Sequence, residues 1–205
     1  MKITNIIFDI GRVLVEFDWN TYLHGFGLEK EKEDAIARAM FTGPYWSELD
    51  RGVWSIEQLL DGFVSLAPQY RKEIEEVFAH SEQCISGLAY ARPWLQDLKS
   101  RGFRVYYLSN YSEWTRCRTA EALNFLDLMN GGLFSYEVGF VKPDPAIFQA
   151  LIDRYPEIIP EESVFFDDTA VNVDAACRFG LHGILFHNQK QAEHDLLELL
   201  KSTSF

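Results

Sequence analysis

The segment IIFDIGRVLV at residues 6–15 constrains this chain more than any other part of its sequence. The apolar run at residues 3–8 is typical of a buried strand, and it stops abruptly at the carboxylate of Asp9. A carboxylate at the end of a buried strand is poorly placed for stability but well placed to meet a ligand. Three later segments, 108–110, 142–145 and 165–168, place polar residues at or beyond the ends of apolar runs. The sequence therefore predicts one site assembled from four distant segments.

Strand-like and helical segments alternate from about residue 102 onward. Apolar runs predict strands at 103–108, 164–166 and 183–186. Helical periodicity indicates helices at 113–123, 145–155, 171–179 and 190–201. This alternation predicts a parallel sheet covered on both faces, which the opening strand at 3–8 should join.

Residues 16–90 show a different pattern, in which helical periodicity is not interrupted by any convincing strand. The helical segments are 19–26, 29–40, 55–66 and 71–81. Ser55 and Gln58 have the spacing of a capping box at the start of the third segment. We therefore predict an α/β fold with a Rossmann-like parallel-sheet core domain at 1–15 and 91–205. A helical cap domain at 16–90 is inserted into it.

The chain is strongly acidic, with a formal net charge of −12 among its 205 residues. Such a chain has no general electrostatic attraction for nucleic acid or for an anionic membrane surface, so neither is an expected partner. The three cysteines form no closely spaced pair, and the N-terminus lacks a signal-peptide pattern. We expect a reduced cytoplasmic protein that is either a monomer or a homodimer.

Asp9 is the candidate nucleophile, and Gly11 shapes the loop that follows it. The absence of a side chain at Gly11 lets the backbone approach a ligand closely, so that peptide groups can face an anion or a metal. The structural alternative is that Asp9 only caps a turn.

Ser109, Asn110 and Lys142 are candidate phosphate-binding residues. A hydroxyl and an amide at the entrance to a helix can cradle a phosphate, although they can equally form a local turn. Lys142 precedes a proline, which favours an extended loop in which its charge can neutralise a phosphate oxygen. A solvated surface lysine is the alternative.

Asp167 and Asp168 are adjacent carboxylates that follow a buried strand. Two neighbouring anions repel each other, and a bound Mg²⁺ would resolve the repulsion because hard cations prefer oxygen ligands. In the alternative, one side chain caps the next helix while the other faces water.

At these four places the chain resembles the haloacid dehalogenase-like hydrolase superfamily. The pattern FDIGRVLV, LSN, VKPD and VFFDDTAVNV is especially similar to the branch that includes bacterial α-D-glucose-1-phosphate phosphatase. The helical insert corresponds to the family's C1 cap.

The resemblance implies a Mg²⁺-dependent phosphatase that acts on a small phosphorylated metabolite, such as a sugar phosphate. Asp9 would attack phosphorus and form an aspartyl-phosphate that water hydrolyses. Asp9, the Gly11 carbonyl and Asp168 would hold Mg²⁺, with Asp167 acting behind them. Ser109, Asn110, Lys142 and the backbone near Gly11 would hold the phosphoryl group.

The chain departs from the usual family pattern at three positions. Gly11 replaces the second aspartate that acts as general acid and base, and Glu16 or Asp18 is a possible substitute. Asn172 stands where many members have an acidic residue, and it is expected to contact Asp168 or a metal-bound water. Arg12 stands where small residues are common, and it either reaches the substrate entrance or is merely exposed.

The cap is expected to select the substrate. Its aromatic residues can stack on a sugar ring, although most such residues form the core of a helical domain. Trp46 and Arg51 lie near an irregular stretch and are the candidates for substrate contact. Two other functions remain open: a metal-independent haloacid dehalogenase, and a non-catalytic protein that binds a phosphorylated ligand.

Overall fold

The computed structural model describes residues 2–203, and its central feature is a five-stranded parallel sheet. The strands occur in the order β5 (Gly131–Phe134), β4 (Arg104–Ser109), β1 (Asn5–Phe8), β6 (Ser163–Asp167) and β7 (His182–Leu185). Every residue of β1 is buried, which accounts for its continuous apolar sequence. The opening segment therefore forms the middle strand, and the predicted parallel sheet is confirmed.

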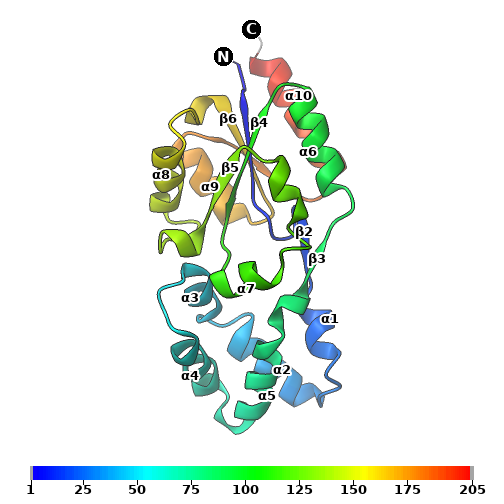
Figure 1. The fold of residues 1–205 in the computed structure, drawn as a ribbon, viewed down its shortest axis with the longest axis vertical. Helices are drawn as coiled ribbons and strands as arrows, with labels where there is room; N and C mark the ends of the chain where they lie inside the picture. The colour runs from blue at the N-terminus through cyan, green and yellow to red at the C-terminus, as the bar shows by residue number, and fades with distance from the viewer. Residues whose placement is uncertain (1, 204–205) are drawn as a thin grey trace.

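Helices cover both faces of this sheet, as Figure 1 shows. They are α6 (Ala91–Ser100) and α10 (Gln189–Thr203) on one face and α8 (Pro145–Arg154) and α9 (Ala170–Phe179) on the other, whereas α7 (Glu113–Arg118) lies beyond the edge of the sheet, beside the insert. Side chains alternate along β1, so Ile6 and Phe8 join the cluster formed with α6 and α10. Ile7 faces the opposite way and packs in the cluster formed with α8 and α9. This alternation is the two-residue period expected of a strand buried on both faces.

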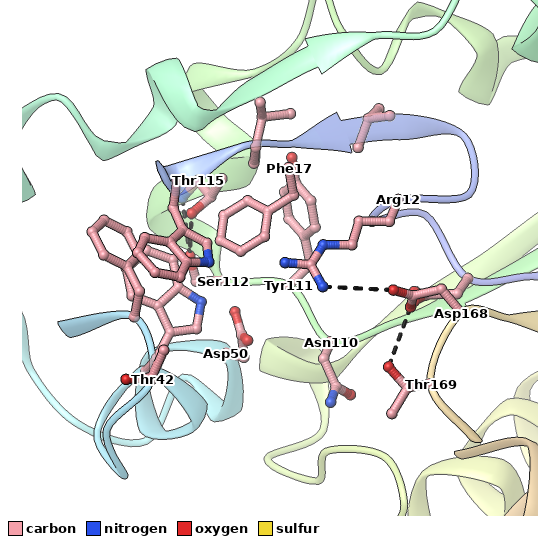
Figure 2. A pocket seen from close by; sticks show the side chains of 17 residues that line it. Arg12, Phe17, Thr42, Asp50, Asn110, Tyr111, Ser112, Thr115, Asp168 and Thr169 are labelled. Carbon is pink, nitrogen blue, oxygen red and sulfur yellow. Dashed lines mark hydrogen bonds and ion pairs between the residues drawn. The ribbon is translucent and has the colours of Figure 1, made fainter. Parts of the chain in front are cut away.

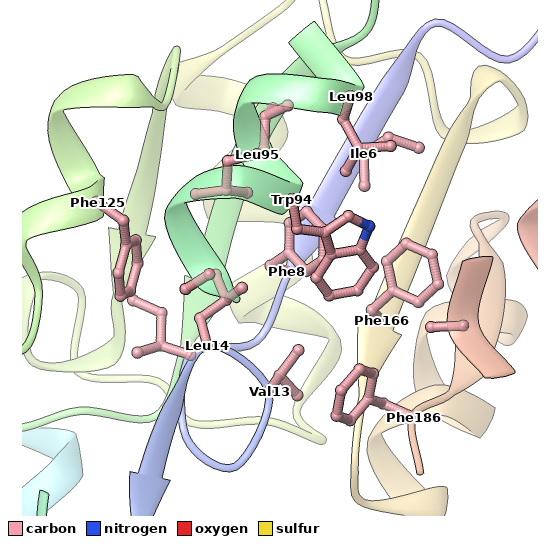
Figure 3. Packing of buried hydrophobic residues seen from close by; sticks show 14 of the residues in the cluster. Ile6, Phe8, Val13, Leu14, Trp94, Leu95, Leu98, Phe125, Phe166 and Phe186 are labelled. Atoms are coloured by element: carbon pink, nitrogen blue, oxygen red, sulfur yellow. The ribbon is translucent and has the colours of Figure 1, made fainter. Parts of the chain in front are cut away.

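Trp94 of α6 fills the space between that helix and the sheet (Figure 3). Its ring centroid lies 4.8 Å from that of Phe8, 5.7 Å from that of Phe166 and 6.0 Å from that of Phe186. Trp94 is only 2% exposed, and its indole N–H donates to Glu193 of α10. One aromatic side chain thus joins the middle of the sheet to two helices.

The insert between β1 and the rest of the sheet is mainly helical and packs around its own apolar cluster. Its helices are α1 (Trp19–His24), α2 (Lys30–Met40), α3 (Trp46–Arg51), α4 (Ile56–Leu66) and α5 (Arg71–Ala79). The predicted capping box at the start of α4 is present, with Ser55 and Gln58 each bonding the other's backbone. Short 3-10 helices occupy Pro68–Tyr70, Ser81–Cys84, Asn124–Leu128, Ser135–Glu137 and Pro160–Glu162.

The prediction that residues 16–90 contain no strand is wrong. β2 (Val15–Phe17) pairs antiparallel with β3 (Ile85–Gly87), so a two-stranded ribbon carries the chain into and out of the insert. Each strand has three residues, too few for an alternating pattern to appear in the sequence. The predicted domain boundaries fall within β2 and at the first residue of α6, and the separate clusters support the proposed division.

β5 and α3 have no counterpart in the predicted elements, and the helix predicted at 113–123 is shorter in the structure. α7 ends at Arg118, because Thr119 leaves the helical conformation and its hydroxyl bonds the carbonyl of Thr115. Glycines weaken the strand signal of β5. Gly132 is nevertheless required there, since a Cβ would lie 2.3 Å from the Tyr107 ring. Within residues 2–203, no helix combines the length and apolar character needed to cross a membrane.

We predict that Trp94→Ala lowers the free energy of unfolding by about 3–5 kcal/mol, the usual loss for truncating a large buried aromatic residue. Urea unfolding followed by circular dichroism measures this loss. Trp54→Ala is the matched control, because Trp54 is 36% exposed. The control should change the free energy by about 1 kcal/mol or less, and equal losses would contradict the packing role of Trp94.

Candidate active site

The order of the strands brings three polar residues together at the carboxyl edge of the sheet. Asp9 directly follows β1, while Ser109 ends β4 and Asp167 ends β6, the two strands that flank β1. The Asp9 backbone N–H donates to the Phe166 carbonyl at 2.8 Å, which continues the ladder to this point. Asp9 and Asp167, which are 158 positions apart in the sequence, therefore lie on neighbouring strand ends.

The Asp9 carboxylate is held by one of its two oxygens. Oδ1 accepts hydrogen bonds from the Ile10 backbone N–H at 2.7 Å and from the Ser109 hydroxyl at 2.8 Å. The same oxygen lies 2.9 Å from the Lys142 ammonium nitrogen. No donor in the described part of the chain contacts Oδ2. One oxygen thus fixes the carboxylate while the other remains available to a ligand.

Lys142 lies between two carboxylates and is only 4% exposed. Its Nζ is 2.7 Å from Oδ2 of Asp167, in addition to its contact with Asp9. The Asn110 carboxamide holds the lysine backbone on both sides, donating to the Lys142 carbonyl at 3.0 Å and accepting from the Lys142 N–H at 2.7 Å. Asn110 therefore positions Lys142, and direct binding of phosphate by Asn110 remains a prediction.

Asp167 is fully buried and surrounded by donors. It accepts from the Thr169 backbone N–H at 2.8 Å, from Lys142, and from the Asn172 amide, which lies 3.1 Å from each carboxylate oxygen. Asn172 was expected to contact Asp168 or a metal-bound water, but its amide is committed to Asp167. Asp167 pairs with the buried Lys142, so the hydrogen bonds from Asn172 fix the carboxylate that holds this cation.

Asp168 is more accessible than Asp167 and has weaker contacts. Oδ1 accepts from the Thr169 hydroxyl at 3.2 Å, and Oδ2 lies 3.8 Å from the Arg12 guanidinium. Arg12 has the left-handed φ of +57°, and its side chain also lies over the Phe17 ring. Arg12 therefore both reaches the site and stays half exposed.

The carboxylates of Asp9, Asp167 and Asp168 fit a hard divalent cation. One oxygen from each lies within 4.8 Å of the others, and two of the three residues are buried. Lys142 supplies only one positive charge between Asp9 and Asp167. The remaining excess of negative charge, carried on oxygen donors, is the arrangement that Mg²⁺ prefers.

The pKa values of the site reflect this crowding of charge. Burial raises the pKa of Asp9 to about 6; the positive charge of Lys142 opposes this increase, and Asp167 adds a smaller increase of its own. Burial also raises the pKa of Asp168, and the neighbouring charge of Asp167 adds to the effect. Burial alone would lower the pKa of Lys142, but the attraction of Asp167 and Asp9 outweighs it and raises that pKa.

A cavity of about 450 Å³ opens above this edge, between the sheet and the insert (Figure 2). Asp9, Gly11, Arg12, Asn110 and Asp168 line it from the core side. Its aromatic wall consists of Phe17, Trp19, Phe41, Trp46 and Tyr111. The Trp19 and Phe41 rings are stacked, with their centroids 5.1 Å apart, and the Phe41 and Trp46 ring centroids are 4.9 Å apart. Several cap aromatics therefore face the cavity as well as their own core.

The structure separates the two predicted substrate-contacting residues of the cap. Trp46 lines the cavity, whereas Arg51 is not among its lining residues and lies beside Glu48, with Nε 3.7 Å from Oε2. The neighbouring Asp50 lines the cavity instead, and the sequence analysis missed it. The only signal in the sequence was the presence of an acidic residue in the irregular stretch before Gly52. The direction of the Asp50 side chain depends on helix α3, which was not predicted.

We predict that Lys142→Met lowers the free energy of unfolding by about 3–5 kcal/mol, because two buried carboxylates lose the cation between them. Urea unfolding in EDTA measures the change, and adding Asp167→Asn should recover part of it. Lys30→Met is the control, since the Lys30 side chain is 78% exposed and its ion pairs lie at the surface. A loss for Lys142→Met no larger than that of the control would contradict the buried ion-pair network.

Comparison with known proteins identifies relatives over nearly the whole chain. Phosphatase MT3486 of Mycobacterium tuberculosis is 26% identical over 98% of this chain and 95% of its own length. D-ribitol-5-phosphate phosphatase of Bacteroides thetaiotaomicron is 24% identical over 98% of this chain and 100% of its own length. The mouse bifunctional epoxide hydrolase 2 is 28% identical, but the chain spans only 36% of that protein.

A solved structure shares the fold. It is a HAD family enzyme of Bacteroides thetaiotaomicron in complex with magnesium and inorganic phosphate, with a TM-score of 0.70 and 22% identity over 89% of this chain and 93% of that one. The family model for haloacid dehalogenase-like hydrolases matches residues 5–180. With this match over most of its length, the chain belongs to the haloacid dehalogenase-like hydrolase family.

Proposed function

We propose that this hydrolase is a Mg²⁺-dependent phosphatase that acts on a small phosphomonoester through an aspartyl-phosphate on Asp9. The observation that carries the proposal is the Asp9 carboxylate, which is held through Oδ1 by Ile10, Ser109 and Lys142. Asp9 itself lines the cavity beside Asp168, and its other oxygen has no donor among residues 2–203. This is the preorganised arrangement of nucleophile and charge that phosphoryl transfer requires.

Two side chains orient the proposed nucleophile, and they act together with backbone groups to receive the phosphoryl group. Ser109 donates its single hydroxyl hydrogen to Asp9, and Lys142 directs two of its three N–H groups to Asp9 and Asp167, so Lys142 keeps one donor for a phosphate bound at Asp9. Backbone N–H groups of the loop near Gly11 add donors without adding bulk. Attack by Asp9 releases the alcohol, and water then releases phosphate and restores the carboxylate.

The residues proposed to hold Mg²⁺ are Asp9, the Gly11 carbonyl and Asp168. Asp167 stands behind them, because Asn172, Thr169 and Lys142 already occupy its oxygens. A bound Mg²⁺ would neutralise charge on the phosphoryl oxygens.

We propose a sugar phosphate as the substrate class and a C1-capped enzyme of the glucose-1-phosphate phosphatase branch. The cavity joins a charged floor to aromatic faces, a combination suited to a phosphorylated sugar ring. The phosphatase relatives, one of which is named for a sugar-alcohol phosphate, support this class. Trp46 and Arg12 line the cavity and are the first candidates for substrate contact, while contact by Arg51 requires its side chain to move from Glu48.

We predict that Asp9→Asn lowers phosphate release from p-nitrophenyl phosphate by about 10⁴-fold or more, as removal of a nucleophile does in other enzymes. Asparagine retains an oxygen that can accept from Ile10 and Ser109, so the thermal unfolding temperature should not fall. The matched control is Asp97→Asn on α6, where the carboxylate is 58% exposed. Comparable rates in Asp9→Asn and the control would contradict the proposed mechanism.

We also predict that EDTA abolishes this activity and that added Mg²⁺ restores it. Asp168→Ala should raise the Mg²⁺ concentration for half-maximal activity by about tenfold or more, because the site loses one oxygen ligand. Asp174→Ala is the control, because Asp174 is exposed on the neighbouring helix α9. Full activity in EDTA would refute the metal-dependent proposal and favour the dehalogenase alternative.

A further inference from the structure

A sugar phosphate needs a proton donor that the residues described so far do not supply. Its leaving oxygen becomes an alkoxide unless a general acid protonates it, and such an acid typically contributes about 10²–10⁴-fold. Gly11 has no side chain, although the structure leaves room for one, since a Cβ there would meet no heavy atom within 4 Å. The chain therefore has to obtain its proton donor from another position.

The two sequence candidates for this acid lie away from the cavity. Glu16 is exposed on β2 and does not line the cavity. Asp18 caps α1, where its carboxylate accepts from the Thr21 N–H at 3.0 Å, and these hydrogen bonds lower its pKa. A carboxylate that is already ionised and bonded in a cap is a poor proton donor.

Asp50 is the carboxylate that the cap does direct into the cavity. Figure 2 shows it projecting from the cap side, opposite Asn110 and Asp168 of the core. Its carboxylate accepts no hydrogen bond from any residue between 2 and 203. Asp50 therefore faces the same space as Asp9 without a structural task of its own.

The backbone of Asp50 is fixed to the core. The Ser135 hydroxyl donates to the Asp50 carbonyl at 2.5 Å, and the same hydroxyl accepts from the Tyr111 N–H at 2.9 Å. α3 ends at Arg51 and is capped by Gly52, which has a φ of +72° and where a Cβ would lie 2.7 Å from Tyr136. This close approach and the Ser135 bond hold the last turn of α3 over the sheet edge.

We infer that Asp50 is the general acid and base of this enzyme, an assignment that rests on the proposed phosphatase function. A bond forms between an Asp9 oxygen and phosphorus while the bond from phosphorus to the ester oxygen breaks. The ester oxygen keeps the electron pair and takes the proton of the Asp50 carboxyl. In the second step the water oxygen forms a bond to phosphorus while the Asp50 carboxylate takes one of the water protons. The bond from phosphorus to the Asp9 oxygen breaks, this oxygen keeps the electron pair, and phosphate leaves.

The electrostatic environment supports this assignment. Burial raises the pKa of Asp50 to about 7, and the negative charge of Asp9 adds to the effect, while Lys142 opposes it. A carboxyl group with this pKa holds its proton near neutral pH and can also release it, as a group that acts in both steps must.

The experiment compares two esters of similar shape, phenyl phosphate and p-nitrophenyl phosphate, which lack sugar hydroxyls and differ mainly in leaving-group quality. Asp50→Asn should lower kcat/KM for phenyl phosphate by about 10²-fold or more, and for p-nitrophenyl phosphate by less than about tenfold. Equal losses for the two esters, or no loss, would overturn the inference.

Asp61→Asn is the matched control, because Asp61 lies in the same cap with its side chain 66% exposed. Asparagine should be tolerated at position 50, since the carboxylate has no partner to lose. Asp50→Ala, checked by thermal unfolding, gives the same comparison if Asp50→Asn does not fold. A wild-type enzyme that hydrolyses neither ester with Mg²⁺ would refute the proposed function and the inference with it. An active wild type with equal losses in the variant would refute the inference alone.

Discussion

The buried ammonium group of Lys142 is the interaction on which the rest of the site depends. It lies within 2.9 Å of Asp9 and 2.7 Å of Asp167, two buried carboxylates that would otherwise repel each other. Asn110 holds the lysine backbone, and Asn172 holds Asp167. The arrangement fixes the Asp9 carboxylate while leaving an excess of negative charge that favours a divalent cation.

The topology of the sheet makes this network possible. β1 lies between β4 and β6, and the three strands are parallel. Asp9, Ser109 and Asp167, at the carboxyl ends of these strands, therefore lie side by side at one edge of the sheet. The middle position of β1 also buries it on both faces, where Trp94 packs against it. The same strand therefore anchors the core and presents Asp9, the proposed nucleophile, so that the rigidity of the core is transmitted to the position of this residue.

The insert completes the cavity rather than merely covering it. The ribbon of β2 and β3 ties it to the core at one place, and the contact between Asp50 and Ser135 ties it at another. These two attachments bring a cap carboxylate and an aromatic wall over an edge that already carries the charged groups. Chemistry at this site thus depends on both parts of the chain.

The sequence by itself determined the parallel sheet, most of the helices and the grouping of Asp9, Ser109, Lys142, Asp167 and Asp168 into one site. These features are local, because apolar runs, helical periodicity and strand-end polar residues are visible in short windows. It did not reveal β2, β3 and β5, which are short or rich in glycine, nor the partner of Asn172. It also did not separate Asp50 from Arg51, because the direction of a side chain on a six-residue helix depends on how that helix docks. Only the tertiary structure decides which of two adjacent residues faces the cavity, since docking is set by contacts between residues far apart in the chain.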